Sequence, residues 1–114
     1  MNREIKMTTQ VTLIGRMSEP KLNYTKSGTA ILTFGLAVNK KVKEEEKTSW
    51  FDIKAWGELG ENIVAQCGKG SRVIVTGYME QEVFDDKDGN KRSKIVVVAS
   101  DCGIALRFLN DQTD

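Results

Sequence analysis

Two tryptophans, the only ones in the chain, stand six residues apart in a stretch that alternates like a β-strand. With a strand period of two, residues 49–57 divide into a face of Phe51, Ile53 and Ala55 and a face of Trp50, Asp52, Lys54 and Trp56. The first face is typical of a protein core, whereas the second sets aromatic rings beside charges. A rise of roughly 3.3 Å per residue separates the two rings by about 20 Å, enough for several stacked bases.

Aromatic platforms along a charged strand are a device for holding single-stranded nucleic acid, in which each stacked base contributes about 1–3 kcal/mol. The pattern therefore indicates a nucleic-acid surface on this strand. The alternative is that one or both tryptophans close a core or a subunit contact. Asp52 should keep phosphate away from its own position and could orient Lys54, and its role stays open at this point.

Length and composition favour one globular domain whose low net charge gives it no strong overall electrostatic field. The chain has 114 residues, 39% hydrophobic and 29% charged, with a net charge of +1. Charge is uneven, since residues 21–54 hold seven lysines against four acids, a local balance of +3. The N-terminal ten residues lack the apolar run of a signal peptide, and no stretch approaches the ~20 apolar residues of a membrane span.

The residue inventory argues against catalysis and metal binding. There is no His, and Cys67 and Cys102 match no metal-ligand spacing, so we expect no metal, no cofactor and no enzymatic activity. The stretch 68–71 (Gly-Lys-Gly-Ser) lacks the spacing of a phosphate-binding P-loop. The two cysteines are expected to be buried free thiols, with a disulfide as the alternative.

Periodicity and turn residues predict three strands, one helix and two further strands. The expected strands are 10–17 (interrupted at Pro20 and resumed at 21–24), 30–39, 50–56, 71–84 and 94–100, and the helix is 57–70. Residues 40–48 are expected to form a charged, mobile loop, with a solvated hairpin loop as the alternative, and residues 85–90 a hairpin tip. This order predicts an all-β fold, a five-stranded Greek-key OB-fold barrel with one helix between strands 3 and 4.

Three parts of the chain are expected. We expect a flexible N-terminus at residues 1–9, an OB-fold domain that binds single-stranded nucleic acid at residues 10–100, and a short tail at residues 101–114. In that tail, Leu106, Phe108 and Leu109 are expected to pack against the body. Tyr78 is expected at a subunit contact or in the core, and Arg16 either pairs structurally or touches phosphate.

Several short motifs, in order and at family spacing, resemble the bacterial-type single-stranded DNA-binding proteins over roughly residues 10–100. They are 13–16 (LIGR), 27–28 (SG), 34–39 (FGLAVN), 50–53 (WFDI), 69–77 (KGSRVIVTG), 88–90 (DGN) and 96–99 (VVVA). The resemblance implies an OB-fold without enzymatic activity that binds and protects single-stranded DNA, independently of sequence, during replication, recombination and repair. It also implies a homo-oligomer, a tetramer before a dimer, in the cytoplasm of a bacterial cell or phage-infected host, at the nucleoid or replication fork.

The resemblance also assigns site residues. Trp50 and Trp56 match the stacking aromatics of the third strand, and Phe84 matches that of the long hairpin, although a core position is its alternative. The phosphate partners implied by position are Lys40, Lys41, Lys54, Lys87, Lys91, Arg92 and Lys94.

Three departures from the family pattern stand out. Val42 occupies a place where some members carry a further aromatic, and the turn at 18–20 is one residue short. The acidic tail that recruits replication and repair enzymes is not found before Asp114, which suggests a phage or mobile-element member, or a shortened paralogue. The alternative function is an OB-fold assembly factor that binds protein in a primosome or recombination complex, in keeping with the Glu44–Glu46 run and the low net charge.

Overall fold

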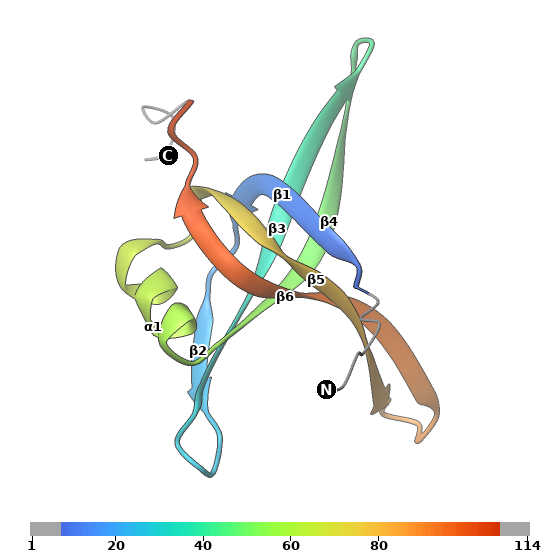
Figure 1. Ribbon diagram of the computed structural model, residues 1–114. Coiled ribbons are helices and arrows are strands. Elements are labelled where there is room, and N and C mark those ends of the chain that lie inside the picture. Colours follow the sequence, from blue (N-terminus) through green and yellow to red (C-terminus); the bar gives the residue numbers. More distant parts are fainter. Residues whose placement is uncertain (1–7, 108–114) are drawn as a thin grey trace, which may run out of the picture.

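The protein forms a curved β-sheet with a single helix packed at one end, as seen in the computed structural model, which describes residues 8–107 (Figure 1). The elements are β1 (Gln10–Met17), β2 (Lys21–Tyr24), β3 (Ala30–Val42), β4 (Glu45–Trp56), α1 (Gly57–Gln66), β5 (Arg72–Asp85) and β6 (Lys91–Ile104). β1 and β2 are the two halves of the strand that the sequence predicts to be interrupted at Pro20. With these counted as one strand, the helix follows the third strand, as expected.

The sheet closes on itself to form a barrel. Its order is β1-β5-β6-β4-β3-β2, and a further pairing of β1 with β3 joins the ends. All pairings are antiparallel except that of β4 with β6, which joins residues 52–54 to residues 96–98. A closed five-stranded barrel with one helix between the third and fourth strands confirms the predicted OB fold.

Alternation along the strands builds the core inside this barrel. In β3 and β4 every second residue faces inward, and Leu32, Leu36, Ile53 and Ala55 are fully buried there. β5 and β6 contribute valines from the opposite wall. Because β4 uses its odd-numbered residues for the core, its even-numbered residues must face outward.

Helix α1 is shorter than the sequence predicts. It ends at Gln66 rather than near Gly70, because Cys67 has an extended backbone (φ −131°, ψ 155°) while its N–H still donates to the Ile63 carbonyl. Residues 68–71 then form a turn that returns to β1, where the Gly70 N–H donates to the Met17 carbonyl at 2.8 Å. Arg16 also donates to the Gly70 carbonyl, so its structural role is the one observed.

The expectation of a mobile loop at 40–48 is wrong. β3 and β4 remain paired out to Val42 and Glu45, which leaves only a tight turn at residues 43 and 44. The backbone ladder of β3 with β4 continues from the barrel through this segment, where it sets Lys41 opposite Glu46 but also Lys40 opposite Lys47, so the pairing does not depend on matched charges. The result is a long β-hairpin that projects from the barrel (Figure 1).

The C-terminal part of the fold also differs from expectation. β6 continues to Ile104, past the predicted end at Ser100, and Ala105 is buried whereas Leu106 is exposed. The Leu106 packing expected from sequence is therefore wrong, because Ala105 takes the inward position. Phe108 and Leu109 lie outside the described residues.

The two cysteines are free thiols and are half-buried rather than buried. Both line a cavity between α1 and β6, together with Ile63 and Asp101. Burial raises the pKa of Cys67, and it raises the pKa of Cys102 to about 11, with a smaller contribution from the neighbouring Cys67.

We predict that the two faces of β4 respond oppositely to truncation. Ile53→Ala should lower the free energy of unfolding by about 2–5 kcal/mol, because it removes a fully buried side chain from a packed core. Trp50→Ala should leave most of the stability intact, since that ring faces outward. Thermal and denaturant unfolding of both variants tests this, and an equal loss in the two would contradict the assignment of faces.

Candidate nucleic-acid interface

The three aromatic side chains singled out in the sequence are all exposed. Trp50 retains 64% of its accessible surface, Trp56 45% and Phe84 44%. Trp50 and Trp56 project from the outward face of β4, and Phe84 lies near the end of β5. Trp56 is also the residue that precedes α1, with an extended backbone, yet its ring stays half in solvent. None of the three belongs to the hydrophobic core.

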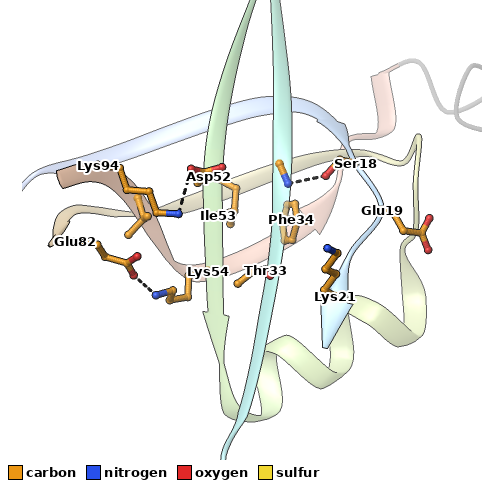
Figure 2. Close-up of a pocket in the computed structure, with 12 residues that line it drawn as sticks. Ser18, Glu19, Lys21, Thr33, Phe34, Asp52, Ile53, Lys54, Glu82 and Lys94 are labelled. Atoms are coloured by element: carbon orange, nitrogen blue, oxygen red, sulfur yellow. Dashed lines mark hydrogen bonds and ion pairs between the residues drawn. The ribbon is translucent and has the colours of Figure 1, made fainter. Parts of the chain in front are cut away.

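Trp50 lies over a glycine of the neighbouring strand. A Cβ atom added to Gly35 would come within 3.3 Å of the Trp50 ring and 3.2 Å of the Ser18 hydroxyl oxygen. The Gly35 N–H donates to that hydroxyl oxygen at 2.7 Å, which ties the turn after β1 to β3 (Figure 2). Because Gly35 has no side chain, the Trp50 ring can pack closely against the sheet at this position.

Lys54 has two partners on the outward face. Its ammonium group forms an ion pair with Glu82 of β5 and stands 5.9 Å from the centre of the Trp56 ring. At this distance the cation is attracted by the π-electrons of the ring. The pair is well shielded, since the side chains of Lys54 and Glu82 are 20% and 27% exposed.

Lys94 of β6 repeats this arrangement about a second ring. Its ammonium group stands 3.8 Å from a carboxylate oxygen of Asp52 and 5.9 Å from the centre of the Phe84 ring. Asp52 thus pairs with Lys94, not with Lys54 as the sequence suggested. This pair is more open than the other, with 48% and 62% of the two side chains exposed.

These contacts join the aromatic rings into one surface, which we call the ring face and define as Trp50, Asp52, Lys54, Trp56, Glu82, Phe84 and Lys94. Asp52 and Lys54 sit between the two tryptophans on β4, and their partners reach over from β5 and β6 (Figure 2). A cavity opens on this surface: Asp52, Lys54, Glu82 and Lys94 line it, together with apolar residues that include Phe34, Ile53 and Val96. An extended polymer with flat apolar groups and negative charges fits such a surface.

The tip of the β5–β6 hairpin carries three more of the predicted cations, Lys87, Lys91 and Arg92. Lys91 lies 3.6 Å from Asp85, and Arg92 donates to Asp86 at 2.8 Å. The other Asp86 oxygen accepts the backbone N–H groups of residues 88 and 90, both at 2.9 Å. The hydrogen bond from Arg92, and then that from the Asn90 backbone, lower the pKa of Asp86.

The remaining two predicted cations, Lys40 and Lys41, are exposed on the β3–β4 hairpin. Figure 1 shows that this hairpin and the β5–β6 hairpin leave the barrel in different directions. The structure thus brings Lys54 and Lys94 into the ring face, with the other five cations on two projecting arms. Within residues 8–107, Lys40, Lys41 and Lys87 have no ion-pair partner.

Sequence reasoning missed Glu82, Gly35 and Ser18 as members of this region. Glu82 could have been found, because it lies two residues before Phe84 and therefore on the same side of β5. Tyr78 is exposed and outside the core cluster, which removes one of its two expected roles. Among residues 8–107 no cluster of three or more potential metal ligands occurs, and no helix there is long and apolar enough to cross a membrane.

Barrel and ring face together define an OB-fold protein, a class whose members bind oligonucleotides or oligosaccharides on one face. Sequence comparison then narrows the class. The profile of the Single-strand binding protein family matches residues 8–105, and the chain belongs to that family.

Individual relatives are similar at a moderate level. The single-stranded DNA-binding proteins of Mycobacterium leprae and Mycolicibacterium smegmatis are each 32% identical to this chain over 108 residues, or 88% of it. A protein of the same name from Paenarthrobacter aurescens is 32% identical over 110 residues, or 90%. The chain spans 64%, 66% and 64% of the lengths of these three relatives.

Gly35→Ala should move the Trp50 ring without unfolding the barrel. The new methyl group meets only side chains, which can shift by a few tenths of an ångström. We expect a changed Trp50 emission spectrum, measured in a Trp56→Phe background, and a stability loss of about 1–3 kcal/mol. Gly103→Ala is the matched control, because nothing lies within 4 Å of its added Cβ. An unchanged emission spectrum in Gly35→Ala would contradict the packing of the Trp50 ring against Gly35.

Acid should loosen the tip of the β5–β6 hairpin. Because folding lowers the pKa of Asp86, its stabilising bonds are complete above the ordinary carboxyl pKa and are lost as pH falls through the lowered value. The chemical shifts of the Asp86 carboxyl carbon and the Asn90 amide, followed by NMR against pH, should change together below the ordinary range. Asp86→Asn should abolish the Asn90 transition. Titration of Asp86 at or above its ordinary pKa would rule this out.

Proposed function

We propose that this protein binds single-stranded DNA without reading its sequence, by stacking bases on Trp50, Trp56 and Phe84. The observation that carries the proposal is the exposure of three aromatic rings, of which Trp56 and Phe84 each have a lysine ammonium group nearby. The single-stranded DNA-binding proteins related to this chain support the same ligand. Paired bases in a duplex cannot offer their flat faces to the rings, so duplex DNA should compete weakly.

Phosphate contacts come from cations around the rings. Lys54 and Lys94 flank the stacking positions, and Lys40, Lys41, Lys87, Lys91 and Arg92 extend the charge along both arms. Lysines provide point charges and the rings provide flat surfaces, so little on this face is suited to reading base edges. We therefore expect similar affinity for matched oligomers of dT, dC and mixed sequence.

Self-association is part of the proposal. Among the described residues, one edge of β1 pairs with β5 along its length, while the other pairs with β3 only at Arg16 and Met17. Exposed Ile14 and Tyr78 lie on one face of the β1–β5 pair. An open strand edge beside apolar residues favours pairing with another chain. We propose a homo-oligomer, a tetramer in preference to a dimer, which protects single strands during replication, recombination and repair.

Each of Trp50→Ala, Trp56→Ala and Phe84→Ala should weaken binding to oligo-dT by about 1–3 kcal/mol, the value of one stacked base. Fluorescence anisotropy of labelled oligo-dT measures this, with thermal melts on the same variants to check folding. Tyr24→Ala is a matched control, because Tyr24 is an exposed aromatic outside the ring face. If Trp56→Ala destabilised the fold as much as Ile53→Ala and left binding intact, the Trp56 ring would stabilise the barrel and would not bind DNA.

Salt should weaken binding in proportion to the phosphates neutralised. The logarithm of affinity should fall with the logarithm of salt concentration at a slope of about −0.7 per phosphate contact. Lys87→Ala should flatten that slope, since Lys87 has no ion-pair partner within residues 8–107. Titrations between low and moderate salt, combined with sedimentation of the protein alone and with oligo-dT, measure slope and oligomeric state. Affinity independent of salt would exclude the phosphate contacts.

A further inference from the structure

The ring face carries two carboxylates among the lysines that the proposed function assigns to phosphate. Asp52 stands between the two tryptophans on β4, and Glu82 lies beside Lys54. Each carboxylate already holds one of the two lysines closest to the rings. A phosphate that approaches either lysine must therefore displace a carboxylate or tolerate its repulsion.

The same two lysines also lie over the rings on which bases would stack. Lys54 stands 5.9 Å from the centre of Trp56, and Lys94 stands 5.9 Å from the centre of Phe84. In this arrangement each of the two rings has an ammonium group on one side, at a distance where the cation and the ring attract each other. The ion pair and the ring contact share a single side chain, so moving the lysine breaks both at once.

We propose that Asp52 and Glu82 are internal competitors of DNA, and that binding exchanges their lysines from carboxylate to phosphate. The exchange also frees the faces of Trp56 and Phe84 for bases. This inference rests on the proposed function and adds two affinity-determining residues to it. Both are acidic, a residue type that a search for DNA contacts would pass over.

The two pairs are not equal. Lys54 and Glu82 are more shielded from water than Lys94 and Asp52, so solvent weakens their interaction less. Glu82 should therefore restrain binding more than Asp52 does. This order is specific to the observed geometry, because net charge alone would give both acids the same weight.

The first test replaces each acid by its amide. At low salt, Glu82→Gln and Asp52→Asn should tighten oligo-dT binding by about threefold to tenfold, the larger gain in Glu82→Gln, as expected for one charge several ångströms from a phosphate. The gain should shrink as salt screens the charge. Asp101→Asn is the control. It removes the same charge outside the ring face and keeps the oxygen that accepts the Cys102 N–H, and it should change affinity less than twofold.

The second test separates exchange from simple repulsion. If lysine must leave Glu82 to reach DNA, Lys54→Ala should cost more affinity in the Glu82→Gln background than in the wild type, because the lysine is then free from the start. Additive effects would overturn the exchange, as would unchanged or weaker binding in both amide variants. A wild-type protein that fails to bind oligo-dT at all would instead refute the proposed function.

Discussion

The arrangement of the ring face depends on three residue pairs between β4 and β6. This short parallel ladder, residues 52–54 against residues 96–98, is one of the pairings that the closed barrel needs, and it sets β6 beside β4. Lys94 can reach Asp52 only because β6 runs along β4 at this register. β5 follows through its long antiparallel pairing with β6, and with it come Glu82 and Phe84. The ring face is thus a consequence of barrel closure.

The division of β4 into two faces could be predicted from sequence because it depends on a local period of two. Ile53 and Ala55 must turn inward if their neighbours are charged or aromatic, and no knowledge of other strands is needed. The order of strands and helix was accessible for a similar reason, since turn residues and helical spacing are short-range signals. Trp50 and Trp56 as exposed rings follow from the same alternation.

The ion pairs could not be predicted in this way. Lys54 and Glu82 are 28 residues apart in the sequence. Their contact can be predicted only from the register of β4 with β6 together with that of β6 with β5. The prediction for residues 40–48 was wrong for a related reason, because the runs of like charge in the sequence do not show that the ladder of β3 with β4 continues to Val42 and Glu45. Sequence shows which residues a strand turns outward, but register decides which charges become partners.

The rings of the ring face are costly to expose, and the lysines reduce that cost. Lys54 near Trp56 and Lys94 near Phe84 each place an ammonium group at a distance where cation and ring attract each other, and this attraction offsets part of the cost of exposure. Gly35 acts differently on Trp50: because Gly35 has no side chain, the Trp50 ring can lie against the neighbouring strand. In both cases an aromatic group is kept in place by neighbours that do not bury it.

The half-buried thiols have a practical consequence for anyone who wishes to attach a dye. With its pKa raised to about 11, Cys102 stays almost entirely in the thiol form at pH 7, and burial acts on Cys67 in the same direction. A cysteine introduced on an exposed arm keeps the ordinary thiol pKa of about 8.5 and a far larger reactive fraction. Maleimide chemistry at neutral pH will therefore favour the new site, with both native cysteines left in their cavity.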